Sequence, residues 1–373
     1  MKVAVVGGGV MGAATAWRLA KRGADVVVYD RHSPPHALGS SHGESRIIRT
    51  AYFEGSWYVP LLQEVFGLWR ELEGISGKRL LTMTGALMIG GESSENVAGA
   101  LAAAKEHHLD AEFLDTEALR RRYRGHVVRA GDVAVLDRQA GILNPDASVA
   151  ALLAHVPHVE SETEVRSISD LRGRFDRVVV AAGPWTPELI DWLPLSVERQ
   201  VHGWFSFARD AEAGSWFTPD RFPAFVRFSD ESGFMYGIPS LDGKTVKVGR
   251  HHEGETTTPQ TIRRRVDERD LDPLRLLTSK YMRGVSGHVT RTLTCMYTNT
   301  PDGHFVIDFS PEDRSVVVIS ACSGHGFKFG PVIGDIAADL VLDGGTRRDI
   351  SRFSAARFAP SPHVPHHDGH RDQ

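Results

Sequence analysis

The sequence of 373 residues has only two cysteines, Cys295 and Cys322, and no run of 18 consecutive apolar residues. Two cysteines cannot build a disulfide framework, and their spacing matches neither a zinc ribbon nor a Cys-x-x-Cys pair. The lack of a long apolar run excludes a membrane-spanning helix. The N-terminus also lacks the basic head and the cleavage site of a secretory signal. These absences predict a soluble, cytoplasmic protein that has no membrane partner.

The chain also has no excess of positive charge. It has 47 acidic and 43 basic residues, which give a formal net charge of −4 with the histidines neutral. A general nucleic-acid binder needs a basic stripe to neutralise phosphates, so we expect no nucleic-acid partner. Apolar residues make up 41% and charged residues 24%, as in ordinary globular proteins, which excludes wholesale disorder. The length predicts two domains or one large one.

A glycine-rich turn stands between the first predicted strand and the first predicted helix. Residues 3–6 are apolar, Gly7, Gly9 and Gly12 follow as a G-x-G-x-x-G motif, and residues 13–22 carry apolar side chains at helical spacing. In a dinucleotide-binding unit the first glycine permits the turn, the second admits a pyrophosphate, and the third allows close helix–strand packing. The motif therefore predicts a cofactor that contains ADP.

The nature of that cofactor depends on two later features. Asp30 follows Gly12 by 18 residues at the end of a second predicted strand, residues 25–30. A carboxylate there accepts a hydrogen bond from a ribose hydroxyl and repels a 2′-phosphate, which disfavours NADP. The run DRVVVAAG at residues 176–183 favours FAD over NAD. Taken alone, these residues also fit a plain turn with a capping aspartate and a buried core strand.

A second glycine-rich segment, SGHGFKFG at residues 323–330, precedes a helix predicted from Pro331 to a stop at Gly344. Three glycines before a helix expose backbone N–H groups toward an anion or a ring carbonyl. In a flavin enzyme the natural guest is the O2 side of the isoalloxazine, where charge accumulates on reduction. A simple strand-to-helix connection gives the same pattern.

The remaining patterns predict the organisation of the chain. A helix is predicted around residues 58–72, a loop at 32–45, a strand pair at 80–90, a helix at 95–108 and a third nucleotide-fold strand near Val165. Further strands are predicted at 200–207, 222–228, 233–238, 245–250, 304–308 and 315–320. This distribution predicts an α/β (α+β) fold in which a discontinuous Rossmann-like FAD-binding domain, residues 1–78, 145–195 and 300–358, carries an inserted, mainly antiparallel substrate domain, residues 79–144 and 196–299. Residues 359–373 are interpreted as a disordered, solvated tail, and no metal site is expected.

Three blocks of the sequence carry a family resemblance. They are GSSHGESRIIR at residues 39–49, CMYTNTPDGHFVID at 295–308, and SGHGFKF at 323–329. Together they resemble the monomeric sarcosine oxidase family, which includes N-methyltryptophan oxidase and the pipecolate-type oxidases, and the similarity runs from residue 1 to about residue 350. The resemblance implies a monomer with a D-amino-acid-oxidase-like two-domain architecture and an FAD bound covalently, Cys295 being joined to the flavin 8α-methyl carbon by a thioether. Cys322 lies outside that linking position and is interpreted as a packing residue.

The resemblance also implies roles for residues around the flavin. It places Arg49 and Lys328 against the carboxylate of an amino-acid substrate, where a planar guanidinium can bind both oxygens. Arg46 and His42 become neighbours of the flavin that favour its reduced, anionic state. The residues implied to bind the cofactor are Gly7, Gly9, Val10, Met11, Gly12, Asp30, Arg31, Ser40, His42, Arg46, Val165, Ala182, Gly183, Cys295, Gly324, His325, Gly326, Phe327 and Lys328.

The middle of the chain supplies the remaining implied residues. Tyr236 and His251 correspond to residues near the substrate's amine and α-carbon, and Tyr297 and Val226 to walls of the pocket. Lys247 corresponds to the lysine that assists oxygen, since a fixed positive charge stabilises superoxide as it develops. The sequence departs from the sarcosine-specific pattern, which has methionine at position 226, and one residue is inserted before Tyr236. Ser45 replaces the more usual threonine.

These residues predict an FAD-dependent amine oxidase of secondary α-amino acids. The C–N bond of a sarcosine-like substrate is oxidised to an imine that hydrolyses, and O2 is reduced to H2O2. An oxidase of cyclic imino acids such as pipecolate or proline is the alternative within this class, and fructosyl amino acid oxidation is a weaker one. From other classes, an NAD-dependent dehydrogenase and a non-catalytic flavoprotein subunit stay open at this stage.

Overall fold

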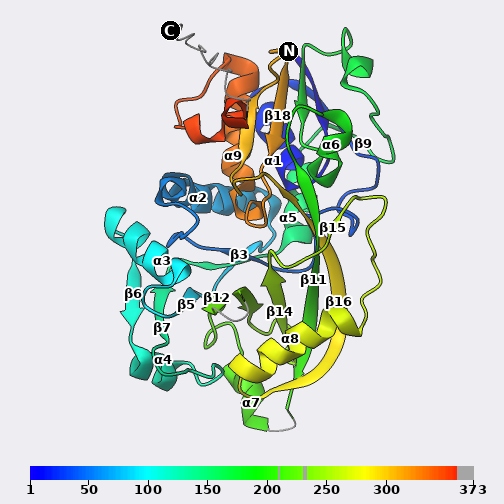
Figure 1. Cartoon of the computed structure of the whole chain (residues 1–373). Coiled ribbons are helices and arrows are strands. Elements are labelled where there is room, and N and C mark those ends of the chain that lie inside the picture. Colours follow the sequence, from blue (N-terminus) through cyan, green and yellow to red (C-terminus); the bar gives the residue numbers. More distant parts are fainter. Residues whose placement is uncertain (209–210, 230–232, 359–373) are drawn as a thin grey trace, which may run out of the picture.

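The computed structural model describes residues 1–208, 211–229 and 233–358, and its two sheets lie one above the other along the long axis of the molecule (Figure 1). A six-stranded sheet lies in the upper half and a nine-stranded sheet in the lower half. Strands β11 (Ser196–Phe207) and β16 (Val285–Asn299) pair with each other and run from one half into the other. The site described below lies where the halves meet.

The upper sheet is the nucleotide-fold sheet expected from the glycine motif. Its strand order is β17-β18-β10-β1-β2-β9, and every neighbouring pair is parallel except β17 with β18. The strands are β1 (Lys2–Val6), β2 (Asp25–Tyr29), β9 (His158–Glu160), β10 (Arg177–Val180), β17 (Val306–Phe309) and β18 (Val316–Ser320). Their valine-rich runs are buried, as is typical of a parallel sheet covered on both faces.

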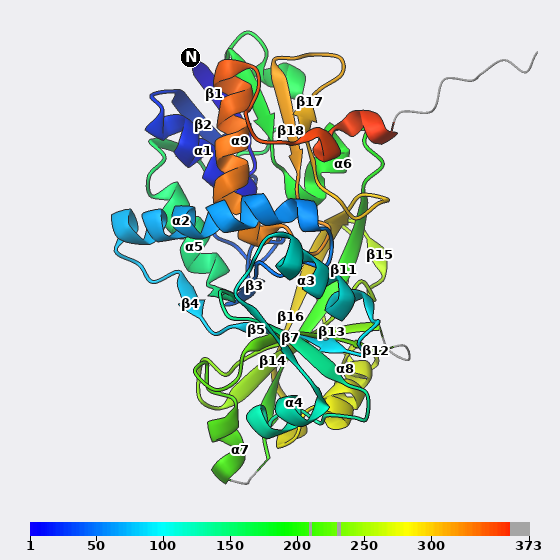
Figure 2. The same ribbon diagram turned by 90° about the vertical axis from the view of Figure 1, so that its left-hand side faces the viewer.

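Helices cover this sheet and connect its strands. They are α1 (Val10–Lys21), α2 (Val59–Ser76), α5 (Pro145–Leu153), α6 (Thr186–Leu189) and α9 (Gly330–Asp343). Helices α1 and α9 lie side by side, and α2 crosses below them (Figure 2). A Cβ atom at Gly334 would lie 2.7 Å from the backbone carbon of Ala14, so this close approach of α9 to α1 requires glycine.

The lower sheet is mainly antiparallel, with the order β15-β11-β14-β13-β12-β5-β7-β6 and β16 paired to β11. One pair, β12 with β5, is parallel. Its strands other than β11 and β16 are β5 (Ala86–Gly90), β6 (Ala111–Leu114), β7 (Val133–Asp137), β12 (Ala224–Ser229), β13 (Gly233–Ile238), β14 (Thr245–His251) and β15 (Thr256–Thr257). Helices α3 (Glu95–Glu106), α4 (Thr116–Arg122), α7 (Ala211–Trp216) and α8 (Glu268–Tyr281) pack around it, and β3 (Arg46–Ile48), β8 (Gly141–Leu143) and β4 (Leu81–Met83) form a small third sheet.

The predicted elements are confirmed with two exceptions, the strand pair at 80–90 and the third nucleotide-fold strand. Both strands of the first are present, but β4 pairs with β8 and β5 pairs with β7 and β12, so the two belong to different sheets. Val165 lies in a loop, and the strand that pairs with β2 is β9, residues His158–Glu160. This strand is only three residues long and lies at the edge of the sheet, where two of its three residues are exposed. It therefore lacks the continuous apolar run by which a buried strand is recognised.

No helix in the described part of the chain is long and apolar enough to cross a membrane. The tail predicted at residues 359–373 lies outside the described residues.

An ion pair is buried in the lower half, on the side of β12 that faces away from the upper sheet. The guanidinium of Arg227 is 1% exposed, forms a salt bridge with Asp132, and lies 4.1 Å from the ring centroid of Tyr281. The same carboxylate accepts a hydrogen bond of 2.7 Å from the backbone N–H of Arg129. Arg227, the residue that follows Val226, is thus part of the core.

We expect Asp132→Asn to lower the free energy of unfolding by about 3 kcal/mol, because it leaves the buried charge of Arg227 without a counter-ion. Urea unfolding of the FAD-loaded protein measures this change. Asp110→Asn is the control, since its salt bridge with Arg138 is about half exposed on both sides (55% and 49%) and the expected change is below about 0.5 kcal/mol. Equal losses in both variants would contradict a stabilising role for the buried pair.

Candidate active site

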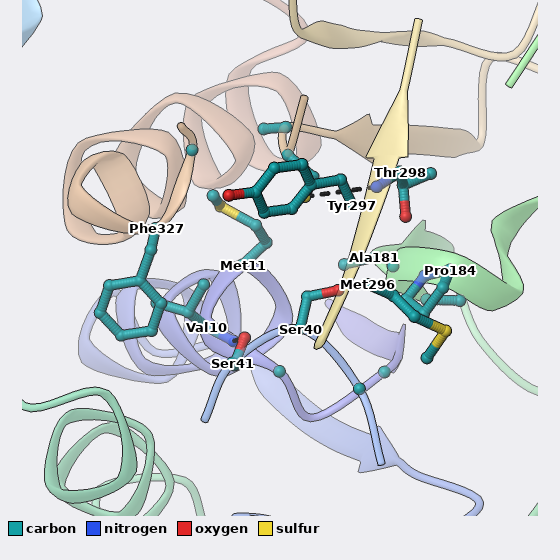
Figure 3. A pocket seen from close by; sticks show the side chains of 18 of the residues that line it. Val10, Met11, Ser40, Ser41, Ala181, Pro184, Met296, Tyr297, Thr298 and Phe327 are labelled. Carbon is teal, nitrogen blue, oxygen red and sulfur yellow. Dashed lines mark hydrogen bonds between the residues drawn. The ribbon is translucent and has the colours of Figure 1, made fainter. Parts of the chain in front are cut away.

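A cavity of about 400 Å³ lies where the carboxyl ends of the parallel strands meet one face of the lower sheet. Figure 3 shows side chains from the start of α1, from the loop at Ser40 and Ser41, and from β16 gathered around it. Of the residues predicted for the site, those that line the cavity are Gly7, Gly9, Val10, Met11, Asp30, Arg31, Ser40, Arg46, Arg49, Val165, Ala182, Gly183, Val226, Tyr236, Lys247, His251, Tyr297, Gly324, His325, Gly326, Phe327 and Lys328. Gly12, His42 and Cys295 are not part of the lining.

The three motif glycines differ in what they do locally. Gly7 has a φ of +106°, and a Cβ there would lie 2.4 Å from the carbonyl oxygen of Ala181. A Cβ at Gly12 would lie 1.8 Å from the carbonyl oxygen of Gly7, so Gly12 serves the packing of α1 on the turn. A Cβ at Gly9 would only come within 3.3 Å of Ser41 Oγ. Gly9 thus leaves the N-terminus of α1 open to the cavity, as an anionic group requires.

Asp30 follows β2 and is 7% exposed at the edge of the cavity. Its Oδ2 accepts a hydrogen bond of 2.7 Å from Gly8 N–H, and its Oδ1 accepts one of 2.8 Å from His32 N–H. Burial raises the pKa of Asp30, but His36 and these two backbone N–H groups outweigh burial and lower it. The side chain is therefore an ionised acceptor, as a ribose hydroxyl requires.

The register of the lower sheet puts the predicted catalytic side chains on one face. Val226 is opposite Tyr236, Tyr236 is opposite Gly249, and β14 continues with Lys247 and His251 at alternate positions. Residues opposite each other in an antiparallel pair share a face, and so do residues two apart in a strand. The same pattern carries this face through β11 to Cys295 and Tyr297 of β16. Side chains from five strands thus converge at the cavity.

Lys247 is buried, with 3% exposed, and its polar contacts are oxygens of the loop before β3. Its Nζ donates hydrogen bonds to the carbonyl oxygens of Gly43 at 2.7 Å and Ser45 at 3.2 Å. Burial lowers the pKa of Lys247 well below its ordinary value, and the positive charge of Arg46 lowers it further. The lysine is therefore a buried base whose charged form would be favoured by any negative charge in the cavity.

Arg46 lies between the cavity and Cys295. Its Nη2 donates a hydrogen bond of 3.1 Å to the carbonyl oxygen of Ser40 and lies 3.6 Å from Cys295 Sγ. The thiol is 1% exposed, and Ser40 and Arg46 belong to the lining in front of it. Burial and Arg46 lower the pKa of His42, which lies behind the lining, to about 3, so its imidazole is neutral.

Arg49 does not present its whole guanidinium to the cavity. Its Nη2 contacts both carboxylate oxygens of Glu54, at 2.5 and 2.6 Å, and its Nη1 donates to the carbonyl oxygen of Ala51. The rings of Tyr52 and Phe53 lie 4.4 and 4.3 Å from the guanidinium carbon. Burial raises the pKa of Glu54, but Arg49 and the other nearby cations lower it to about 2, so it is a carboxylate. Glu54 therefore occupies one of the two terminal nitrogens of Arg49 that were expected to be free for a substrate carboxylate.

Gly324 is required by the side chains it touches. It has a φ of +76°, and a Cβ there would lie 2.6 Å from His251 Cε1 and 2.8 Å from Tyr297 Cε2. The two side chains lie 3.3 Å apart, between His251 Nδ1 and the Tyr297 hydroxyl. Burial lowers the pKa of His251 well below its ordinary value, so the imidazole is neutral. The glycine loop thus lets a neutral histidine and a tyrosine close one wall of the cavity.

The lining also contains residues that the sequence analysis did not assign to the site, among them His202 and Cys322. His202 of β11 is 2% exposed, shares the face of Tyr236 and Lys247, and has no partner for either ring nitrogen among the described residues. Its alternation with apolar neighbours in the predicted strand 200–207 could have identified its face. Cys322, interpreted as packing, lines the cavity and accepts a hydrogen bond of 3.4 Å from Thr298 N–H. Burial raises the pKa of its thiol.

Within the described residues, no group of three or more His, Cys, Asp and Glu side chains could hold a metal ion. The upper sheet supplies a nucleotide site, and the lower sheet brings buried lysine, arginine and histidine side chains to the same cavity. This combination defines the class of the protein, an oxidoreductase that uses a dinucleotide cofactor. The chain belongs to the FAD dependent oxidoreductase family, whose model matches residues 2–340.

Two proteins of known name are similar to the chain over nearly its whole length. The chain is 36% identical to the monomeric sarcosine oxidase of Streptomyces avermitilis, over 96% of this chain and 98% of that protein. It is 32% identical to the N-methyl-L-tryptophan oxidase of Yersinia pestis, over 95% of this chain and 98% of that protein. The family resemblance stated from the three sequence blocks is therefore confirmed, and FAD, in place of NAD, is confirmed as the cofactor.

Solved structures confirm the fold. NikD, an unusual amino acid oxidase essential for nikkomycin biosynthesis, superposes with a TM-score of 0.80 at 26% identity, over 94% of this chain and 96% of that chain. Glycine oxidase from Geobacillus kaustophilus superposes with a TM-score of 0.76 at 21% identity, over 96% of this chain and 99% of that chain. The protein is a flavin-dependent oxidoreductase of this fold.

Proposed function

We propose that the protein oxidises secondary α-amino acids of the sarcosine type to imines that hydrolyse, while O2 is reduced to H2O2. The relatives named as sarcosine oxidase and N-methyl-L-tryptophan oxidase support this reaction. The observation that carries the proposal is the charge of one corner of the cavity. Arg49 and Lys328 are both buried there, and Glu54 supplies a single carboxylate. With Lys328 charged, the corner is therefore complementary to one more negative charge, as a substrate carboxylate provides.

FAD, when bound, accepts the two electrons of the C–N bond and passes them to O2. The cradle left open at Gly9 and the ionised Asp30 fit its ADP part. We assign its covalent attachment to Cys295, the cysteine at the family's linking position, whose Sγ lies 3.6 Å from the Arg46 guanidinium. The other residues assigned to cofactor binding are those that the family resemblance implies, and all of them line the cavity except Gly12 and His42.

The chain's own residues then divide the remaining work. Arg49 and Lys328 hold the substrate carboxylate, and Tyr236 and His251 lie beside the amine. A neutral imidazole can accept a hydrogen bond from the amine N–H, which orients its lone pair. Lys247 supplies the positive charge toward oxygen. Arg46 and His42 are assigned to the cofactor side, where the guanidinium of Arg46 stabilises negative charge, and Tyr297 and Val226 form walls.

Val226 favours a second substrate class, the cyclic imino acids of the pipecolate and proline type. It lines the cavity at a position where sarcosine-specific family members have methionine. A shorter side chain leaves room for a ring at the α-carbon, while the carboxylate site is unchanged. The likeness to NikD, an amino acid oxidase described as unusual, is consistent with a substrate other than sarcosine.

A peroxide assay across matched amines tests the proposal. Sarcosine, N-methylated larger amino acids, pipecolate and proline are compared with dimethylamine, which is sarcosine without its carboxylate. We expect kcat/KM for dimethylamine to be at least about 100-fold below that of the best amino acid, because its binding leaves the excess cation buried and unpaired. Equal oxidation of dimethylamine, or peroxide from none of these compounds, would contradict the proposed function.

A further inference from the structure

A chain of hydrogen bonds lies behind Lys328 and leads away from the cavity. Lys328 Nζ lies 3.3 Å from the hydroxyl of Tyr52, and that hydroxyl lies 2.6 Å from Nδ1 of His325. On its other side, Nε2 of His325 lies 3.0 Å from the carbonyl oxygen of Gly303. The three side chains are 5%, 0% and 9% exposed, so water does not replace these contacts.

The donors and acceptors in this series of hydrogen bonds can be arranged in only one way. The carbonyl oxygen of Gly303 can only accept, so Nε2 of His325 carries the hydrogen. Burial lowers the pKa of His325 to about 3, which keeps the ring neutral and leaves a lone pair on Nδ1. The Tyr52 hydroxyl must then donate to Nδ1, and its oxygen can only accept from Lys328. The order is therefore Lys328 to Tyr52 to His325 to Gly303.

This direction fixes what Lys328 can present to the cavity. One N–H is directed to Tyr52, and a second donates to the carbonyl oxygen of His325 at 2.5 Å. Among the described residues, no other hydrogen-bond partner contacts Nζ, and Lys328 lines the cavity. The remaining position carries a hydrogen when the lysine is charged and a lone pair when it is neutral. Only the charged form can donate to a carboxylate there.

The charged groups around Lys328 do not strongly favour either its charged or its neutral form. Glu54 is nearby, but both of its oxygens are held by Arg49, and the positive charge of Arg49 opposes a second cation. His251 of β14 and His325 face the same corner as neutral rings. Burial and Arg49 lower the pKa of Lys328 to about 7, while Glu54 raises it.

We propose that Tyr52 and His325 are positioning residues that control the protonation of Lys328, so that a carboxylate ligand binds together with one proton. This inference rests on the proposed function, since it takes the ligand of this corner to be the substrate carboxylate. The neutral amine of Lys328 takes the proton from buffer or from the substrate's ammonium group, and the resulting ammonium donates a hydrogen bond to the carboxylate. No other bond forms or breaks.

The affinity for a carboxylate should fall as the pH rises, because only the charged form of Lys328 can donate a hydrogen bond to it. Below about pH 7 free Lys328 is charged and the affinity for a carboxylate is independent of its titration. Above that pH a proton must be taken up, so the affinity falls tenfold for each pH unit until the pKa of the complex is reached. Tyr52 stabilises the ammonium by accepting a hydrogen bond. Loss of the Tyr52 hydroxyl therefore lowers the pKa of Lys328. The pH above which the affinity for a carboxylate begins to fall, here called the break in the pH profile, then becomes lower.

Tyr52→Phe and Tyr58→Phe form a matched pair of variants. The two rings lie 5.3 Å apart in one buried aromatic cluster, and each change removes one hydroxyl. The hydroxyl of Tyr58 contacts His304 Nδ1 at 3.4 Å and not Lys328. Acetate is titrated into the FAD-loaded protein from about pH 6 to about pH 9, with binding read from the flavin absorption. Calorimetry in two buffers of different ionisation enthalpy counts the protons taken up.

We expect Tyr52→Phe to weaken acetate binding about tenfold near pH 8 and less than about twofold near pH 6. Tyr58→Phe should keep the wild-type profile. His325→Leu should shift the break in the same direction as Tyr52→Phe. His325→Gln should largely restore it, because an amide can accept from Tyr52 and donate to Gly303. If Tyr52→Phe fails to fold, the comparison of His325→Leu with His325→Gln tests the same inference.

An unchanged break in both Tyr52→Phe and His325→Leu, or an equal shift in Tyr58→Phe, would overturn the inference. So would acetate binding without proton uptake near pH 8. The proposed function fails separately, if wild-type protein binds acetate with the expected break but produces no peroxide from any amino acid.

Discussion

Cys295→Ser is expected to abolish covalent attachment of the flavin, and Cys322→Ser to leave it intact. The two thiols differ in their electrostatics. Cys295 Sγ lies 3.6 Å from the Arg46 guanidinium, whereas burial raises the pKa of Cys322. The thioether to the 8α-methyl carbon is assigned to Cys295 because this thiol accepts a hydrogen bond from the Arg46 guanidinium, whereas Cys322 accepts one from the backbone N–H of Thr298.

Acid precipitation of the purified protein measures this effect. Wild-type protein and Cys322→Ser should retain yellow colour in the pellet, and Cys295→Ser should release all of its FAD to the supernatant. Cys322 is the sharper control because it lines the cavity, while Cys295 lies behind Ser40 and Arg46. Retention of flavin in Cys295→Ser, with release in Cys322→Ser, would reassign the linkage to Cys322. Release from wild-type protein would show a flavoenzyme without a covalent link.

Lys247→Met is expected to slow reoxidation of the reduced enzyme by O2 about 100- to 1000-fold. Nζ of this lysine is held by Gly43 and Ser45, so its position is fixed before oxygen arrives. A preorganised cation stabilises the negative charge that O2 gains with its first electron and needs no rearrangement at that moment. Anaerobic reduction by substrate does not develop this charge and should change less than about threefold.

Stopped-flow mixing separates the two half-reactions. Lys244→Met is the matched control, because Lys244 is exposed in the turn before β14 and its removal should leave both rates unchanged. Burial lowers the pKa of Lys247, so the reoxidation rate of wild-type protein should also fall as the pH rises and the lysine loses its proton. A loss confined to the reductive half-reaction would contradict the role in oxygen reduction.

The cofactor site is the part most open to sequence reasoning. Gly7, Gly9, Gly12 and Asp30 lie within one strand–turn–helix–strand unit, where local geometry determines what each position tolerates. Only glycine tolerates a left-handed φ, or a position where a Cβ atom would lie 1.8 Å from a carbonyl oxygen. The glycine pattern can therefore be recognised from the sequence alone. The wrong strand prediction near Val165 concerns a three-residue edge strand that has no comparable local signal.

The partners of the site residues were not open to such reasoning. The family resemblance identified Arg49 and Lys328, yet it did not predict that Glu54 occupies half of the Arg49 fork or that Tyr52 and His325 stand behind Lys328. Tyr52 and His325 are 273 positions apart in the sequence. Their meeting depends on how the loop before α2 packs against the loop before α9.

The sequence by itself determined the class of fold and a cofactor that contains ADP, because turns, buried runs and glycine positions depend on near neighbours in the chain. FAD and the residues of the site followed from the family resemblance. Only the tertiary structure decided which side chains meet. The register of β11, β13, β14 and β16 placed Tyr236, Lys247 and His202 on one face. Such pairings follow from side chains packing across strands far apart in sequence, and no local pattern encodes them.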